Sequence, residues 1–296
     1  MSLVAPLALA LALLQAPRPG EAARAAAPRV ERDVLYRTVG TEELRLDAYL
    51  PAAEGTHPGI LMVHGGAWMH GDKRDMSVLG ERLARAGYAC FAPRYRLAPA
   101  YRFPAQIEDC RYALQFVRAE AARFALDPER VGAIGFSAGG HLVALLGVED
   151  EAADASASDP VLHQSSRPQC VVDYFGPVLL TRQPELDFDT QPPPELFGDA
   201  PDSAYAAASP LRLVTRDDVP FLLVHGDADE LVPLEHSRKM DEALRAAGVP
   251  SELVVLAGAG HGDFLFREPD GEYWKRTERF LAARLGSASA EAEPKR

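Results

Sequence analysis

The sequence predicts an α/β fold in which a mostly parallel sheet is covered by helices on both faces. The first observation is a series of short, nearly continuous apolar runs, which suit strands that are buried on both faces. These runs occupy residues 59–64, 88–93, 131–135, 170–174, 221–225 and 253–256. The second observation is that segments with helical periodicity separate the runs, and such alternation indicates parallel strands joined by helical crossovers.

The remaining elements follow from local patterns. Apolar and polar residues alternate over residues 44–50, which predicts a half-buried strand. Residues 103–124 are expected to form a helix, because apolar residues recur there at three- and four-residue steps and Pro104 suits a first helical position. Residues 235–247 form a second expected helix, followed by a glycine, as helix ends often are. A last helix is expected over residues 272–285.

The 296 residues are 47% hydrophobic and 25% charged, which indicates one sizeable globular domain over residues 28–286. The apolar run 3–14 is too short to span a bilayer and is typical of a secretory signal peptide, although no Lys or Arg precedes it. We therefore expect residues 1–27 to be a leader and the protein to be periplasmic or secreted. A mis-assigned start or an N-terminal anchor are the alternatives, and without a signal the protein would be cytoplasmic. Residues 287–296 are small, charged and aperiodic, as in a loose tail.

Charge and cysteine content exclude several classes of function. The 31 basic and 43 acidic residues give a net charge of −12, which disfavours nucleic acid as a partner. Three cysteines without a CxxC pair argue against a disulfide framework, so we expect buried free thiols at Cys90, Cys110 and Cys170. No His/Cys cluster has metal-ligand spacing, so neither a metal nor another cofactor is expected.

Two long stretches interrupt the alternation of strands and helices. Residues 149–167 are rich in Ala, Ser, Asp and Glu, and residues 176–210 contain seven prolines. The second stretch leaves the end of an expected strand, where α/β proteins bind ligands. We expect it to border the site, with a surface insertion that has no role in the site as the alternative.

The strongest chemical signal is the pentapeptide Gly135-Phe136-Ser137-Ala138-Gly139, which lies between an expected strand and an expected helix. The pattern G-x-S-x-G in this context predicts a nucleophile elbow. The serine must occupy a strained position on a tight turn, and side chains at the flanking glycines would collide with the adjoining strand and helix. Ser137 is therefore the expected nucleophile, and the N–H of Ala138 is an expected oxyanion donor.

A second signal, His64-Gly65-Gly66-Ala67-Trp68, follows the expected strand at residues 59–64. Glycines here let backbone N–H groups approach a developing oxyanion without obstruction. We expect Gly66 and Ala67 to donate, and Gly65 is a further candidate. Trp68 and Phe136 are candidates for walls of a substrate pocket, although Trp68 fits the core equally well.

A serine hydroxyl needs a base, and His261 is the expected one. After a G-x-S-x-G elbow the chain order runs serine, acid, histidine, and His261 follows the last expected strand between glycines. His64 is expected to fix its loop and His141 to be structural. The remaining histidines are His57, His70, His163, His225 and His236.

The acid is expected in the segment that follows the strand at residues 221–225. Asp227, Asp229 and Glu230 compete there. In the turn H-G-x-x-D-x-x-V-P the fifth position faces inward, which favours Asp229 as the hydrogen-bond acceptor for His261. Asp227 is expected to cap the turn.

With these residues the chain resembles the α/β-hydrolase superfamily over residues 34–285. It is most similar to bacterial carboxylesterases of the acetyl- and feruloyl-esterase-like branch, near the hormone-sensitive-lipase type. The strings at residues 95–99, 103–110 and 137–142 carry this likeness beyond the three expected catalytic residues. The resemblance implies a three-layer fold with a mostly parallel eight-stranded sheet, and ester hydrolysis through an acyl-enzyme.

One departure keeps other reactions open. Ala67 stands where lipase-like relatives have a third glycine, and arylformamidases share the HGG-x-W form. The expected substrate is a small-molecule or carbohydrate ester of a short acyl group. An arylformamidase-type amide hydrolase, a peptidase of the prolyl-oligopeptidase type and a non-catalytic binding protein on the same fold are the alternatives.

Overall fold

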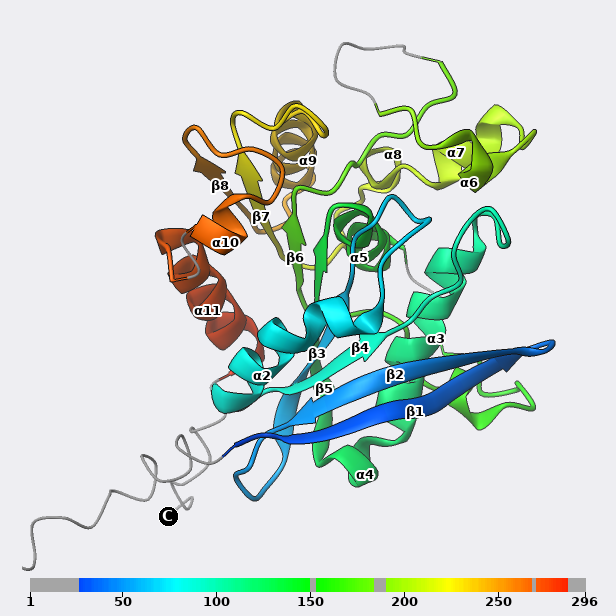
Figure 1. The fold of residues 1–296 in the computed structure, drawn as a ribbon, viewed down its shortest axis with the longest axis vertical. Coiled ribbons are helices and arrows are strands. Elements are labelled where there is room, and N and C mark those ends of the chain that lie inside the picture. Colours follow the sequence, from blue (N-terminus) through cyan, green and yellow to red (C-terminus); the bar gives the residue numbers. More distant parts are fainter. Residues whose placement is uncertain (1–26, 150–152, 184–189, 268–269, 287–296) are drawn as a thin grey trace, which may run out of the picture.

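The computed structural model describes residues 27–149, 153–183, 190–267 and 270–286, and shows an eight-stranded sheet (Figure 1). The strand order is β1-β2-β4-β3-β5-β6-β7-β8. The strands are β1 (Arg29–Val39), β2 (Glu42–Leu50), β3 (His57–Val63), β4 (Ala89–Pro93), β5 (Leu126–Phe136), β6 (Val171–Tyr174), β7 (Phe221–Gly226) and β8 (Ser251–Leu256). Strands β4, β3, β5, β6, β7 and β8 are parallel, as the buried apolar runs predicted. Nearly all of the expected leader and all of the expected tail lie outside the described residues.

The antiparallel edge of the sheet is formed by β1 and β2. Strand β2 confirms a strand at residues 44–50, but this strand is not half-buried, because residues 46–50 are all buried. Strand β1 was not expected. Only Val34 and Tyr36 of β1 are buried, and most of its other residues are polar or charged. An edge strand that buries so few side chains leaves no apolar run in the sequence.

Helices cover both faces of the sheet (Figure 1). One face packs against α2 (Ser77–Arg85) and α11 (Glu272–Leu285), and α10 (Phe264–Arg267) lies beside α11. The other face packs against α3 (Ala105–Ala119), α5 (Ala138–Val148) and α9 (Glu235–Ala246). The core therefore consists of two apolar layers, one on each side of the sheet.

The expected helices are present with small differences. The helix predicted over residues 103–124 is divided at Glu120 into α3 and α4 (Ala121–Phe124), and Pro104 precedes its first turn. The short helix η1 (Lys73–Met76) and α2 were not expected. No helix in the described part of the chain has both the length and the hydropathy needed to cross a bilayer.

The two long stretches lie in different places. The described part of residues 149–167, including η2 (Pro160–His163), packs against α3. The stretch 176–210 carries α6 (Pro194–Phe197), α7 (Asp202–Ala207) and the start of α8 (Pro210–Leu213), which lie together at the carboxyl end of the parallel strands (Figure 1).

Candidate active site

The elbow after β5 places Ser137 between the strand and α5. Ser137 has φ 53° and ψ −120°, a strained conformation that presents its side chain at the carboxyl edge of the sheet. Gly139 permits this turn, because a Cβ atom there would lie 2.2 Å from the carbonyl oxygen of Val63. The glycine lets α5 start directly against β3.

Three of the expected residues meet at this edge. His261 Nε2 lies 2.9 Å from Ser137 Oγ, and His261 Nδ1 lies 2.7 Å from Asp229 Oδ2. A carboxylate can only accept, so Nδ1–H donates to Asp229 and Nε2 is free to accept the serine proton. Ser137, His261 and Asp229 come from the loops after β5, β8 and β7, which the parallel sheet brings to one edge.

The Asp229 carboxylate is buried and well supplied with donors. Its Oδ1 accepts hydrogen bonds from the backbone N–H groups of Leu231 and Val232, each at 2.9 Å. Burial alone would raise the pKa of Asp229, but the contacts with His225 and His261 outweigh it and hold the pKa well below its ordinary value. Asp229 is therefore ionised at neutral pH.

The competing acids lie elsewhere. Asp227 Oδ1 accepts a hydrogen bond of 2.6 Å from the N–H of Gly258, at the start of the loop that carries His261. Glu230 is exposed to solvent. Asp227 thus tethers the two loops to each other and does not contact the imidazole.

The loop after β3 has a tightly wound backbone. Gly66, Ala67 and Trp68 have φ values of 113°, 51° and 59°, and the Gly66 carbonyl accepts hydrogen bonds from the N–H groups of Met69 and His70. Gly65 lies against the elbow, because a Cβ atom there would be 2.8 Å from the Phe136 carbonyl oxygen. No acceptor in the described part of the chain engages the N–H groups of Gly66, Ala67 and Ala138. Of these residues, Ala67 and Ala138 line the same cavity as Ser137.

His64, which directly precedes Gly65, stabilises this loop through contacts with Gly65 and Tyr95. Its Nδ1–H donates to the Gly65 carbonyl at 2.8 Å, and its ring stacks on Tyr95 at 4.3 Å. The Tyr95 hydroxyl donates to the His64 carbonyl at 3.1 Å. His64 is fully buried, and burial lowers its pKa, so it holds the loop as a neutral side chain.

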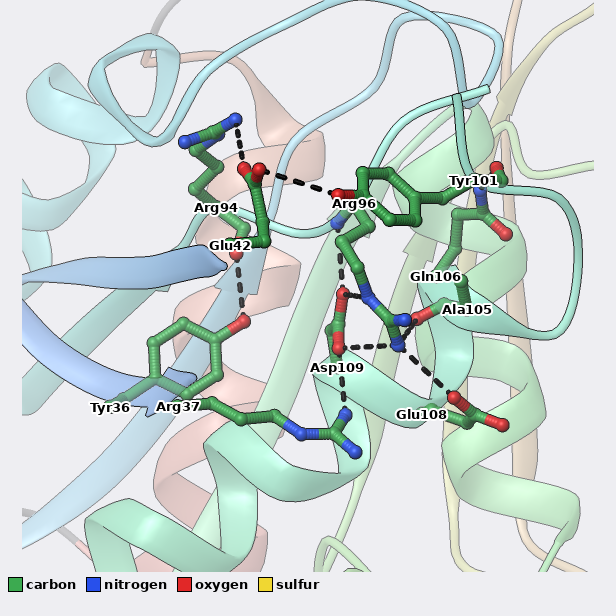
Figure 2. A network of polar contacts seen from close by, with 10 residues as sticks. All are labelled: Tyr36, Arg37, Glu42, Arg94, Arg96, Tyr101, Ala105, Gln106, Glu108 and Asp109. Carbon is green, nitrogen blue, oxygen red and sulfur yellow. Dashed lines mark hydrogen bonds and ion pairs between the residues drawn. The ribbon is translucent and has the colours of Figure 1, made fainter. Parts of the chain in front are cut away.

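A polar network fixes the segment that carries Tyr95 (Figure 2). Arg96 donates from Nε to Asp109 Oδ2 at 2.8 Å and from Nη2 to Oδ1 at 2.9 Å, and Arg37 donates to Oδ1 at 2.7 Å. Such bidentate pairs restrict geometry as well as contributing energy. Because the N–H of Ala98 also donates to the Trp68 carbonyl at 3.0 Å, this segment holds the loop after β3 at two points.

A cavity of about 620 Å³ opens beside Ser137. Its lining includes Trp68, Ala138, Pro177, Thr181, Pro193 and Leu231, so the stretch 176–210 borders the site as expected. Trp68 serves both roles that the sequence left open, because it is 3% exposed and still lines the cavity. Its indole N–H donates to His141 Nδ1 at 3.1 Å, which confirms a structural role for His141.

Phe136 does not line this cavity, and its expected place in the substrate pocket is wrong. Side chains alternate between the faces of a strand, and Phe136 faces the layer covered by α2 and α11. There its ring stacks on Tyr174 at 4.7 Å.

Comparison with known proteins identifies the family. The sequence matches the family BD-FAE over residues 46–244, which is well over half of the chain. The chain belongs to the BD-FAE family. The strand order and the solved relatives also show that this BD-FAE member has the α/β-hydrolase fold and lies in the esterase branch of that superfamily.

Individual relatives agree with this membership. Esterase LipC of Mycobacterium tuberculosis is 34% identical over 69% of this chain and 53% of its own length, so the BD-FAE chain spans about half of that relative. A truncated carbohydrate esterase from gut microbiota is 28% identical with a TM-score of 0.75, over 88% of this chain and 97% of the other. Esterase Est2 of Thermogutta terrifontis, solved with butyrate bound, is 26% identical with a TM-score of 0.74. The match covers 90% of this chain and 97% of Est2.

The cysteines of this BD-FAE member are three buried free thiols, as predicted. Burial raises the pKa values of Cys90 and Cys110 well above the ordinary value and that of Cys170 to about 12. Within the described ranges, no group of three or more His, Cys, Asp or Glu side chains is arranged to hold a metal ion.

Asp173 on β6 is a residue near the site that the sequence analysis missed. It is fully buried, its Oδ1 accepts from the N–H of Gly176 at 2.8 Å, and its Oδ2 has no partner. Burial raises its pKa from 3.8 to about 6. The apolar run at residues 170–174 gave no sign that one of its members is a buried acid with a perturbed pKa.

We expect Asp173→Asn to stabilise the BD-FAE chain at pH 8. The folded protein holds the Asp173 proton to higher pH than the unfolded chain, so the cost of the buried charge is absent below pH 3.8 and complete above about pH 6. The variant removes that cost and retains an acceptor for Gly176, so its free energy of unfolding relative to wild type should be roughly 2–3 kcal/mol higher at pH 8 than at pH 4. Urea unfolding at pH 8 and pH 4 measures it, with Asp199→Asn, a substitution of an exposed carboxylate, as control. A difference between variant and wild type that does not change with pH would refute the assigned shift.

Proposed function

We propose that this protein is a serine carboxylesterase that hydrolyses esters of short acyl groups. Ser137 is the nucleophile, His261 the general base and Asp229 the group that orients it. The observation that carries the proposal is the pair of hydrogen bonds, 2.9 Å and 2.7 Å, that joins these side chains beside unengaged backbone N–H groups. The relatives reported above support it, because LipC, the gut-microbiota protein and Est2 are all described as esterases.

The reaction follows from the geometry. Ser137 Oγ forms a bond to the acyl carbon while its proton passes to His261 Nε2. The N–H groups of Gly66, Ala67 and Ala138 receive the oxyanion. When the intermediate collapses, the bond to the alcohol oxygen breaks and His261 returns the proton to that oxygen. Water then attacks the acyl-enzyme by the same steps, which releases the acid and restores Ser137.

Asp229 contributes in each proton transfer. Its ionised carboxylate accepts from Nδ1–H, which fixes the tautomer that leaves Nε2 unprotonated towards Ser137. The same charge favours the imidazolium that forms when His261 takes the proton.

We expect a preference for acetyl to butyryl esters. Trp68 and the prolines of the 176–210 stretch restrict the cavity beside Ser137, and each additional methylene gains only about 0.8 kcal/mol where there is room for it. Relative kcat/KM values for 4-nitrophenyl esters of two to sixteen carbons measure the preference, and activity should fall steeply beyond about eight carbons. Highest activity on long-chain triglycerides would contradict this expectation. The butyrate bound to Est2 agrees with a short acyl group.

The esterase proposal is tested by offering three scissile bonds of matched size. Purified protein is given a short-chain ester, an aryl formamide and an aminoacyl amide, with Ser137→Ala as the control for each. Hydrolysis of the ester alone, or at much the highest kcat/KM, supports the proposal. A higher kcat/KM on the formamide would assign an arylformamidase, and a higher kcat/KM on the amide would assign a peptidase.

A further inference from the structure

Asp229 is contacted by a second imidazole besides that of His261. His225, near the end of β7, is fully buried, and its Nε2 lies 3.3 Å from Asp229 Oδ2, the same oxygen that accepts from His261. The sequence analysis assigned no role to His225. Both of its ring nitrogens are engaged by Ser237 and Val232, so it is not placed to take the serine proton.

The hydrogen bonds of His225 determine which of its nitrogens carries the proton. Nε2 lies 2.9 Å from the Val232 carbonyl oxygen, which can only accept, so Nε2 is protonated. Nδ1 lies 2.7 Å from Ser237 Oγ on α9, a hydroxyl that can donate or accept. His225 therefore carries a proton on Nε2, the nitrogen that lies 3.3 Å from Asp229 Oδ2.

This N–H competes with His261 for one carboxylate oxygen. A positive hydrogen close to Oδ2 stabilises the ionised carboxylate and makes it a weaker acceptor towards His261. A weaker acceptor stabilises the His261 imidazolium less.

We propose that His225 is a positioning residue, which holds the Asp229 carboxylate and thereby sets the pH above which His261 is a free base. This inference rests on the proposed function, because it concerns the base of that same reaction. It assigns to β7 a role in tuning the proton transfer in addition to carrying the acid.

Other groups face His225 and must be separated from this effect. Asp229 comes from the loop after β7, Asp173 from β6 and the uncharged Ser237 from α9. The centroid of the Phe175 ring lies 6.5 Å from that of the His225 ring and 4.7 Å from that of the His261 ring, so Phe175 packs against both imidazoles. Asp173 is the only other carboxyl group among them. Its raised pKa of about 6 falls in the pH range of the acid limb, the low-pH part of the profile over which kcat/KM rises with pH.

The experiment compares two amides at position 225. The amide N–H of glutamine can reach the place of Nε2, whereas the shorter asparagine can replace only Nδ1. The kcat/KM for 4-nitrophenyl butyrate is measured from pH 5 to pH 9 for wild type, His225→Gln and His225→Asn. Ser237→Ala and Asp173→Asn are the controls, since both alter the surroundings of His225 and leave its N–H in place.

We expect the acid limb of His225→Asn to move to higher pH by about half a unit, and that of His225→Gln to stay on the wild-type curve. An unchanged limb in His225→Asn would overturn the proposal. An equal shift in Ser237→Ala would also overturn it, because the cause would then be local loosening. If Asp173→Asn displaced the limb as far, the limb would report Asp173 and the proposal would fall.

A second measurement does not depend on the folding of any variant. Nitrogen-15 NMR of the wild-type protein should show a proton on Nε2 of His225, and an unprotonated Nε2, as in the Nδ1–H tautomer, would refute the proposal. An inactive wild type would refute the esterase assignment instead, and the NMR result would then still decide the state of His225.

Discussion

Replacing Ser137 with alanine should reduce ester hydrolysis by about 10⁴-fold or more. Ser137 Oγ is the hydroxyl held at 2.9 Å from His261 Nε2, at the turn where the N–H of Ala138 is also available to an oxyanion. Alanine fits the same backbone conformation no worse than serine, so the fold should remain intact. The measurements are kcat/KM for a short-chain ester and the thermal unfolding midpoint of both proteins.

A matched control is Ser156→Ala, which removes an exposed serine whose hydroxyl binds Asp154 in the 149–167 stretch. It should leave kcat/KM unchanged. An organophosphonate should label wild type at Ser137 and fail to label Ser137→Ala. Retention of a tenth of the wild-type activity by Ser137→Ala would remove this serine as the nucleophile.

His261→Ala should cause a loss as large as Ser137→Ala, and the double variant should lose no more than either single variant. Nucleophile and base act in the same proton transfer, so once either one is absent, removing the other lowers the rate no further. Asp229→Asn should lose one to two orders of magnitude less, because Ser137, His261 and the N–H donors remain while the imidazole is poorly oriented. Rates for the four variants on one ester provide the comparison.

The control for His261 is His163→Ala, an exposed histidine that contacts the Ala157 carbonyl away from the cavity. Additive losses in the double variant would show that Ser137 and His261 act independently. If Asp227→Asn lowered kcat/KM more than Asp229→Asn, the acid would be Asp227, against the hydrogen bonds seen in the turn.

Much of the fold could be predicted because its buried strands leave a direct record in the sequence. Strands β3 to β7 bury apolar residues on both faces, so each appears as an apolar run. Strand β8 also has an apolar run, although only Val254 of it is buried. Strand β1 could not be found this way, because it buries only Val34 and Tyr36 and depends on pairing with β2. It pairs with β2 across the two-residue turn at Gly40 and Thr41, a local feature that the search for apolar runs does not detect.

The residues of the candidate site also divide into those that a local sequence pattern indicates and those that it does not. Ser137, Asp229 and His261 were found from local turns whose backbone geometry requires particular residues. The misplacement of Phe136 has a simple cause, since adjacent residues of a strand face opposite sides and the sequence does not show which side holds the cavity. The environments of Asp173 and His225 arise only where β6, β7 and α9 meet, so no local pattern could indicate them.

The wall of the cavity is attached to the rest of the molecule through its main chain and through buried side chains such as those of Leu180 and Leu196. His141 Nε2–H donates to the Ala208 carbonyl at 2.7 Å, the N–H of Val178 donates to His236 at 3.2 Å, and the N–H of Phe103 donates to the Leu196 carbonyl at 2.9 Å. These anchors do not involve the side chains of Pro193 or the other residues that face the opening. Natural variation or laboratory selection can therefore exchange those side chains and change the range of accepted substrates. The relative positions of Ser137, His261 and Asp229 would not change.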